Sequence, residues 1–250
     1  MYIAIYSAFI SPTSIAYIKT VIDYLNANQH DFILVDRLRK HLDDKGAAYK
    51  YFKDDQVIEE KVDFLFSVGG DGTLLRSITV IRDTKIPILG INAGRLGFLT
   101  SIKKDTLEEG LDLFFEGKYT NIKRSLLEVS TKKPVDILQH FKYALNEVSI
   151  NRKNTTSLLS IDAKLDDQFL TTYWADGLII ATPTGSTGYS LSSGGPIVSP
   201  SSECLIVNPI APHNINMRPL IVPDKTIFEI SVKGRGKNYL LSLDSRILTI

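Results

Sequence analysis

The sequence predicts two domains: an α/β domain with a mostly parallel sheet, followed by a β-rich, sandwich-like domain. Up to about residue 122, apolar runs typical of buried strands alternate with helical patterns, which favours a parallel sheet covered by helices. After that point, short strand-like runs are separated by polar or turn residues, which favours an antiparallel sandwich or barrel-like domain. We therefore expect domains at 1–122 and 123–250, with room for two cores.

The elements of the first domain follow from helix and strand signals in order. Ser11-Pro12 is a helix cap with proline in the first turn, and apolar residues from Ile15 to Leu25 then recur on one helical face. A last helix stops at Gly117. The expected strands are 2–9, 31–36, 63–68 and 87–92, and the later expected helices are 74–83 and 105–116.

The second domain reads as a series of short strands. The runs are 123–133, 141–150, 157–165, 167–174 and 176–183. Asp166-Asp167 stands between two alternating segments and predicts a hairpin. The run "TIFEISVKGRGKNYLLSL" predicts a second hairpin around Gly234-Arg235-Gly236. A short helix is expected to start near Tyr189.

Composition excludes several classes of function. The net charge of +1 argues against a nucleic-acid partner held by bulk electrostatics. The single cysteine, Cys204, excludes a disulfide scaffold and favours a reducing compartment. No uncharged apolar run approaches the roughly 20 residues that span a bilayer, and no basic segment precedes the apolar N-terminal run. We expect a cytoplasmic protein with no membrane partner.

The segment "GGDGT" (69–73) follows a predicted buried strand and precedes a predicted helix. In such a turn, backbone N–H groups converge on an anion, and glycines leave room for its approach or permit positive φ. Gly69, Gly70, Gly72 and Thr73 are therefore candidate phosphate contacts, with a purely structural tight turn as the alternative. Asp71 is an anion itself, and beside a phosphate it would either accept a proton or hold Mg²⁺.

The motif points to phosphoryl transfer and not to another nucleotide loop. It lacks the Gly-Lys-Ser/Thr of a Walker A motif and the three glycines of the dinucleotide fingerprint. GGDGT resembles the motif shared by NAD kinases, diacylglycerol and sphingoid-lipid kinases and, more distantly, phosphofructokinases. By itself the motif leaves the substrate open.

Four further stretches resemble the NAD kinase family in particular, in that family's order. They are "GINAGRLGFLT" (90–100), "NEVSI" (146–150), "DGLIIATPTGSTGYSLSSGGPIV" (176–198) and "APHNINMRPLIVP" (211–223). The third is the most specific, because lipid kinases share GGDGT without it. The resemblance implies an α/β domain and a β-rich domain with the site between them, and assembly as a homodimer or homotetramer.

The resemblance also implies the reaction and its residues. Asp71 would be the base that deprotonates the adenosine 2′-hydroxyl of NAD, with ATP or polyphosphate as donor, Mg²⁺ as cofactor and NADP as product. The other implied NAD contacts are Gly72, Leu75, Phe98, Asn146, Glu147, Asp176, Thr187, Tyr189 and Ser192. In some members, the residue matching Asp176 reaches NAD from a neighbouring subunit. Substrate and ATP would supply most oxygens around the metal, so no metal ligands are assigned.

The sequence departs from the family pattern at a few positions. Trp174-Ala175 stands where many relatives carry a basic residue and glycine, and Gly188 stands where alanine is usual. "LDSR" (243–246) replaces the typical Asp-Gly-Gln and keeps only Asp244. Relatives usually continue past "ILTI" with a segment that returns to the first domain.

Two alternative functions follow from these features. One is a lipid kinase of the same superfamily, which would need an apolar groove or membrane-binding face. The other is a catalytically inactive nucleotide-binding sensor, which the divergent "LDSR" favours and an intact Asp71 opposes. For His213, a local hydrogen-bonding role is expected in place of a zinc site, because no other ligand stands at suitable spacing.

Overall fold

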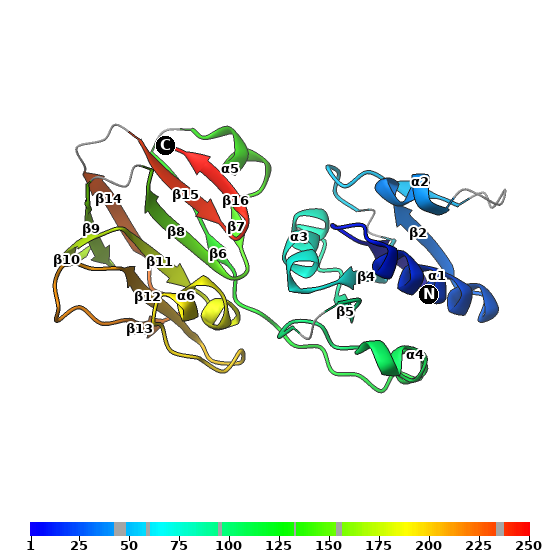
Figure 1. Ribbon diagram of the computed structural model, residues 1–250. Coiled ribbons are helices and arrows are strands. Elements are labelled where there is room, and N and C mark those ends of the chain that lie inside the picture. Colours follow the sequence, from blue (N-terminus) through cyan, green and yellow to red (C-terminus); the bar gives the residue numbers. More distant parts are fainter. Residues whose placement is uncertain (43–48, 59–60, 95–96, 133, 154–156, 234–237) are drawn as a thin grey trace. The chain divides into compact units, whose positions relative to one another are not determined.

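The structure is a computed structural model that describes residues 1–42, 49–58, 61–94, 97–132, 134–153, 157–233 and 238–250. The chain forms two compact units, Met1–Asn121 and Ile122–Ile250 (Figure 1). No helix in the described part of the chain combines the length and the apolar character that crossing a membrane requires.

The first unit is built on a five-stranded sheet in the order β3-β2-β1-β4-β5, and every pairing in it is parallel. The strands are β1 (Tyr2–Tyr6), β2 (Asp31–Val35), β3 (Tyr51–Phe52), β4 (Phe64–Gly69) and β5 (Ile88–Asn92). The central strands β1 and β4 are almost entirely buried, as strands covered on both faces should be. The prediction of a parallel α/β domain is confirmed.

The helices of the first unit begin and end at recognisable signals. They are α1 (Pro12–Ala27), α2 (Arg39–Leu42), α3 (Asp71–Ile81) and α4 (Leu107–Phe115), with short 3-10 turns η1 (Asp36–Leu38) and η2 (Lys104–Thr106). Ser11 caps α1 in a capping box with Ser14, as Ser11-Pro12 predicted. Gly117, at φ +74°, follows the end of α4.

Aromatic side chains fix α4 against the sheet. Phe64 and Phe66 project from the same face of β4, and both meet the Phe114 ring edge-on at 4.8 and 5.2 Å between centroids. The Tyr24 hydroxyl donates to Asp112 over 2.6 Å and ties α1 to α4. Together these contacts close the core on this side of the sheet.

The strand order creates a switch point between β1 and β4. The unit β1-α1-β2 runs outward from β1, and β4-α3-β5 runs outward from β4 in the opposite direction. Right-handed crossovers then place α1 and α3 on opposite faces. In open α/β sheets, ligands bind outside the carboxyl ends of the strands at such a point. Here that position holds the segment after β4, which is GGDGT.

The second unit contains antiparallel sheets, as predicted. A six-stranded sheet has the order β13-β12-β11-β8-β15-β16, a three-stranded sheet has the order β10-β9-β14, and β6 pairs with β7. The strands are β6 (Leu127–Glu128), β7 (Tyr143–Ala144), β8 (Glu147–Arg152), β9 (Leu159–Leu165), β10 (Gln168–Ala175), β11 (Gly177–Ala181), β12 (Cys204–Ile210), β13 (Leu220–Pro223), β14 (Phe228–Lys233), β15 (Tyr239–Leu243) and β16 (Arg246–Thr249). Short helices are α5 (Asp136–His140), η3 (Thr184–Thr187) and α6 (Tyr189–Ser192).

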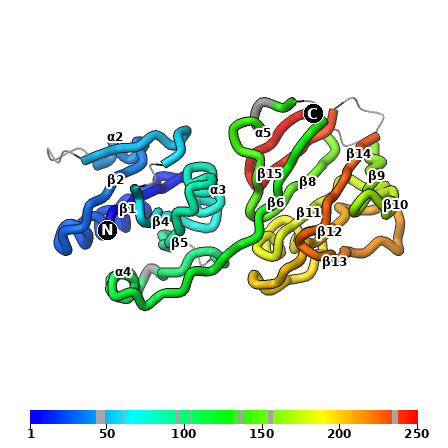
Figure 2. Tube along the Cα trace, turned by 180° about the vertical axis from the view of Figure 1, so that it is seen from behind, coloured from blue at the N-terminus to red at the C-terminus, as the bar shows by residue number. Residues whose placement is uncertain are grey.

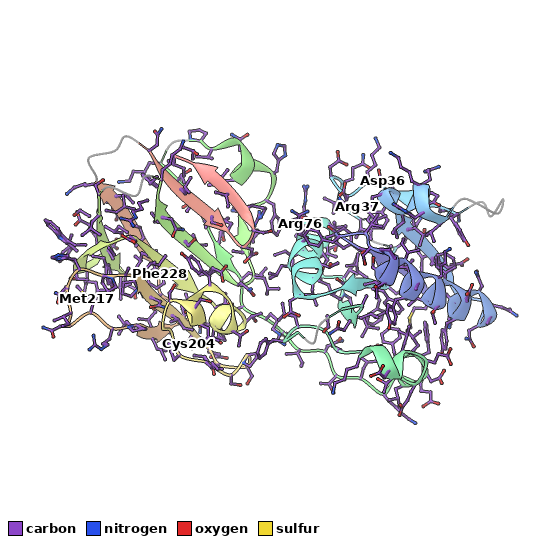
Figure 3. All side chains as sticks on the ribbon, in the orientation of Figure 1. Asp36, Arg37, Arg76, Cys204, Met217 and Phe228 are labelled. Atoms are coloured by element: carbon purple, nitrogen blue, oxygen red, sulfur yellow. The ribbon has the colours of Figure 1, made fainter. Side chains whose placement is uncertain are left out.

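The two larger sheets pack through alternate residues. Leu178 and Val207 of the six-stranded sheet share a buried cluster with Ile161 of β9. Phe228 of β14, labelled in Figure 3, packs against this cluster and against a second one on β11, β12 and β15. The opposite face of the six-stranded sheet is therefore free to carry polar side chains.

The predicted hairpins have different outcomes. Asp166 and Asp167 form the β9–β10 turn with φ of +47° and +66°, so the first prediction is confirmed. The second is wrong, because β14 pairs with β9 and β15 pairs with β8 and β16, as Figure 2 shows. The chain changes sheets between these strands, and Gly234-Arg235-Gly236 lies outside the described residues. The expected strand at 123–133 is reduced to the two residues of β6.

Candidate functional site

The GGDGT segment joins β4 to α3 without an intervening loop. Gly69 is the last residue of β4, Gly70 is the N-cap of α3, and Asp71 begins the helix three residues earlier than the expected start at residue 74. Asp71 therefore lies in the first helical turn, where the helix dipole favours a negative charge. The Thr73 N–H donates to the Gly70 carbonyl at 2.9 Å, so the N–H groups that this turn offers to an anion are those of Asp71 and Gly72.

The three glycines of the segment serve different purposes. None of them has positive φ, so backbone conformation does not require glycine here. A Cβ on Gly69 would lie 2.7 Å from the Thr73 Cβ, because the Thr73 side chain is buried against this position. A Cβ on Gly70 would meet nothing within 4 Å, and one on Gly72 only the Phe9 ring at 3.7 Å. The space beside Gly70 and Gly72 is left open by the protein.

The Asp71 carboxylate is held by the segment after β5. Its Oδ2 accepts the Phe98 N–H at 2.8 Å, and its Oδ1 accepts the Leu99 N–H at 3.0 Å. Gly97 allows this approach, because a Cβ there would lie 2.6 Å from the Asp71 Cγ. The structure thus joins GGDGT to the "GINAGRLGFLT" stretch. Of the predicted apolar walls, Leu75 is half-buried and the Phe98 side chain is 70% exposed.

Two arginines add positive charge near this edge of the sheet. The Arg76 guanidinium lies over the exposed Phe9 ring at 4.9 Å, and no described carboxylate pairs with it. Arg37 donates to the Ala8 carbonyl at 2.8 Å and forms an ion pair with Asp54. Burial raises the pKa of Tyr6, and both guanidiniums oppose that rise, so both lie near the end of β1 (Figure 3). This charge suits an anionic ligand.

Two surface hollows on the first unit lie along α1 and beside η2 and α4. No predicted site residue lines either of them, so the candidate site is recognised by its chemical groups.

In the second unit, the polar face of the six-stranded sheet carries the other predicted residues. Glu147, Ser149 and Asn151 alternate along β8 and lie opposite the core-facing side chains. The Asn151 amide donates to the Ser149 hydroxyl at 2.9 Å. Asn208 of β12 shares this face and donates from Nδ2 to the Ser190 carbonyl at 2.8 Å, which anchors α6.

The backbone of residues 145–147 is completely bonded. Asp244, in the β15–β16 turn, accepts the N–H groups of all three residues at 3.0, 2.7 and 3.2 Å. Its own N–H donates to the Glu147 carbonyl at 2.9 Å. Thr182 donates from its hydroxyl to the Leu145 carbonyl at 2.6 Å and from its N–H to the Asn146 carbonyl at 2.9 Å. Two residues thereby fix the position of Asn146 and Glu147.

The side chains of Asn146 and Glu147 retain unused hydrogen-bonding atoms. Asn146 Oδ1 and Glu147 Oε2 are buried and have no partner among the described residues. Burial, and then the Asp244 charge, raise the pKa of Glu147 to about 7, although the Tyr189 N–H lowers it by donating to the carboxylate. A Cβ on Gly188 would lie 3.1 Å from Glu147 Oε2, so only a small residue fits there. Buried polar atoms without partners mark a place for a polar ligand.

The remaining residues of the long glycine-rich stretch surround this pair unequally. Tyr189 is 42% exposed, and its hydroxyl is 3.4 Å from Asn151 Oδ1. The Thr187 hydroxyl donates to the Thr184 carbonyl at 3.5 Å, and Ser192 is exposed at the end of α6. A Cβ on Gly185 would lie 2.7 Å from the Asn146 Cα, so this loop packs directly on the Asn146 backbone.

Comparison with known proteins decides the family. A model of the ATP-NAD kinase N-terminal domain matches residues 17–119, and a model of the ATP-NAD kinase C-terminal domain matches residues 145–249. The chain belongs to the NAD kinase family. NAD kinases of Flavobacterium psychrophilum and Christiangramia forsetii are 44% and 45% identical to it over its full length, and the match covers 86% of each.

Solved structures agree with this assignment. Yeast NADH kinase complexed with NADH has a TM-score of 0.84 at 25% identity, and the match covers 99% of this chain and 76% of the yeast chain. An NAD kinase from Archaeoglobus fulgidus in complex with ATP has a TM-score of 0.77 at 25% identity, over 99% of this chain and 86% of the archaeal one. This NAD kinase family member is thus a phosphotransferase, and the lipid-kinase and sensor alternatives find no support.

Asp176 lies apart from the Asn146–Glu147 pair in this NAD kinase family member. It precedes β11 and forms an ion pair with Arg152 at 2.8 Å, whereas Glu147 pairs with Ala181 at the other end of that strand. Five residues of strand separate these ends by about 17 Å. Within one subunit, the structure does not bring Asp176 to the pair.

Sequence reasoning missed the residues that hold the predicted ones. Thr182 and Asp244 contact backbone groups of residues 145–147, and Asn208 contacts Ser190 of α6. Two signals were available: Thr182 lies in the long glycine-rich stretch 176–198, and Asp244 is the residue of "LDSR" that keeps the Asp of the Asp-Gly-Gln pattern.

Proposed function

We propose that the chain transfers a phosphoryl group from ATP to the adenosine 2′-hydroxyl of NAD, giving NADP. The observation that carries the proposal is the Asp71 carboxylate, fixed in the first turn of α3 between glycine positions that the protein leaves open. A carboxylate at this position repels phosphate and so weakens its binding. Its presence is explained if it takes part in the transfer. The choice of NAD as the phosphoryl acceptor rests on membership of the NAD kinase family.

Asp71 acts as the general base. The 2′-hydroxyl gives its proton to a carboxylate oxygen of Asp71 as its oxygen bonds to the γ-phosphorus, and the bond from that phosphorus to the β-bridging oxygen breaks to release ADP. Each Asp71 oxygen accepts one backbone N–H, so the carboxylate is oriented and a lone pair remains for the proton. Gly69, Gly70, Gly72 and Thr73 shape the loop that receives the phosphates.

Mg²⁺ enters as the partner of ATP. Within the described residues, no group of three or more metal-binding side chains occurs, so this part of the chain offers no cage for the ion. Phosphate and water oxygens then supply most of its ligands, which suits the coordination that Mg²⁺ prefers. When bound, it neutralises charge on the β- and γ-phosphates. Inorganic polyphosphate is a second donor with the same anionic chemistry.

The second unit holds the dinucleotide. Asn146 Oδ1 and Glu147 Oε2 accept hydrogen bonds from the ribose hydroxyls and the exocyclic amino group of the adenine of NAD. The half-exposed Tyr189 ring offers a flat surface, and Thr187 and Ser192 offer hydroxyls. Leu75 and Phe98 contribute apolar contact. We assign Asp176 to a neighbouring subunit's dinucleotide in a homodimer or homotetramer, because in its own subunit it lies far from Asn146.

The test is NADP formation by the purified protein given NAD, ATP and Mg²⁺, read through an NADP-specific dehydrogenase. Asp71→Asn should lower turnover by about 10²- to 10⁴-fold while the Kd for NAD changes little. Asp63→Asn is the control, because Asp63 lies in the same unit and its carboxylate, like that of Asp71, accepts from the backbone, here the Tyr2 N–H at 2.7 Å. No NADP from the wild type would overturn the function, and near-normal turnover of Asp71→Asn would overturn the base.

A further inference from the structure

Asp244 is a buried carboxylate that the proposed reaction does not use. It lies in the turn between β15 and β16, at φ +52°. Both of its carboxylate oxygens accept hydrogen bonds from the N–H groups of residues 145–147. Its side-chain hydrogen bonds all go to the segment that carries Asn146 and Glu147. A surface turn would not need a buried acidic residue.

Arg246, the first residue of β16, completes this attachment. Arg246 donates to the Phe141 carbonyl at 2.7 Å and to the Tyr143 carbonyl, and its guanidinium lies over the Phe141 ring at 4.9 Å. Burial raises the pKa of Asp244, while the three N–H donors and the Arg246 charge oppose that rise. Asp244 and Arg246 therefore form hydrogen bonds to the backbone on both sides of Ala144, close to the start of β8.

We propose that Asp244 is a positioning residue for the dinucleotide, holding the backbone of residues 145–147 so that the Asn146 and Glu147 side chains stay together and face the substrate. The inference rests on the proposed function, because it takes NAD as the ligand of that pair. Asp244 acts through Asn146 and Glu147 and makes no substrate contact of its own.

Asp244 also acts on Glu147 through its charge, which gives the role a signature that simple scaffolding lacks. Two described groups act on the Glu147 carboxylate: the Asp244 charge from the β15–β16 turn and the Tyr189 N–H from α6. The Arg246 charge acts in turn on Asp244. The side chains of η3 and of the end of β11 are neutral. An ionised Glu147 is the form that accepts hydrogen bonds from ribose hydroxyls. Binding of NAD should therefore expel the proton that Glu147 holds below about pH 7.

The test is the Kd for NAD, measured by calorimetry from well below to well above pH 7, for the wild type, Asp244→Asn and Asp166→Asn. Asn tolerates the positive φ, and its one carbonyl oxygen can keep the bonds from Asn146 and Glu147, but its amide then faces the Leu145 N–H. Asp166 is the matched control, since it too has positive φ in a hairpin turn and accepts one backbone N–H, from Ile227 at 2.9 Å.

The expected wild-type affinity rises with pH and levels off above about pH 7. Asp244→Asn should bind NAD about ten- to hundredfold more weakly at high pH. Its midpoint should also move to lower pH, because the charge that raises the Glu147 pKa is gone. The KM for ATP should stay near its wild-type value, and Asp166→Asn should match the wild type throughout.

Two results overturn the proposal. One is wild-type NAD affinity in Asp244→Asn; the other is a uniform loss at every pH with an unmoved midpoint, which means that Asp244 only supports the fold. If Asp244→Asn does not fold, Glu147→Gln decides: the pH dependence must vanish in that variant, and its persistence refutes the role of Glu147 and Asp244 together. Formation of NADP by the wild type, measured separately, keeps these failures distinct from failure of the proposed function.

Discussion

Thr182 provides the sharpest test of how the Asn146 segment is held. Its side chain is fully buried, donates to the Leu145 carbonyl at 2.6 Å and accepts the Gly185 N–H at 3.2 Å. Thr182→Val keeps the shape and removes both bonds, leaving a buried carbonyl and a buried N–H without partners. Each such group costs about 1–3 kcal/mol. The new methyl group returns about 0.8 kcal/mol. We expect a net loss of about 1–5 kcal/mol in the free energy of unfolding, centred on about 3 kcal/mol.

The assay follows urea unfolding through Trp174, the chain's single tryptophan, which lies in β10 and reports on the second unit. Thr182→Ser is the matched control, because it keeps the hydroxyl and loses only a methyl group, at about 1 kcal/mol. The Kd for NAD should rise in Thr182→Val and stay nearly unchanged in Thr182→Ser. Equal stability of the two variants would refute the reasoning, since the hydroxyl would then contribute nothing.

Four further substitutions test local features. Gly69→Ala should destabilise the first unit by about 1–3 kcal/mol, because its Cβ would press on buried Thr73. Gly72→Ala, in a helix with open space, should stabilise by about 0.5–1 kcal/mol yet raise the KM for ATP; equal unfolding curves for the two glycine variants would contradict this contrast. Ser11→Ala should cost about 1 kcal/mol through the lost cap of α1, and an unchanged Tm would argue against the cap. Arg246→Gln should cost about 1–3 kcal/mol by releasing two carbonyls, seen as a lower urea midpoint of Trp174 fluorescence, and no shift would exclude that role.

Most of the first unit could be predicted because its signals are local. Ser11-Pro12 caps α1 through neighbours only three residues away, and the strand of residues 63–68 is apolar on both faces because helices cover both. The start of α3 was missed because Gly-Asp-Gly has poor helix propensity. There the chain passes directly from β4 into the helix, and tertiary context overrides propensity.

For the second unit, the antiparallel β-rich class was predicted correctly, but the pairing of some strands was not. Alternating residues tell which face of a strand is buried, but not which strand lies beside it, so β14 and β15 were wrongly joined as a hairpin. Asp166-Asp167 succeeded because a two-residue turn specifies its own hairpin. Asp244 could not be assigned, because an aspartate in a turn is ordinary and its partners are 97 to 99 residues away.

That separation has a consequence for protein synthesis. Residues 145–147 leave the ribosome 97 residues before the carboxylate that bonds to Glu147, an interval of roughly 5–20 s at about 5–20 residues per second. During that time, the N–H groups of residues 145–147 lack the acceptor that Asp244 later supplies. For the proposed function, this order means that the GGDGT segment can form well before the Asn146–Glu147 pair is fixed to receive its substrate.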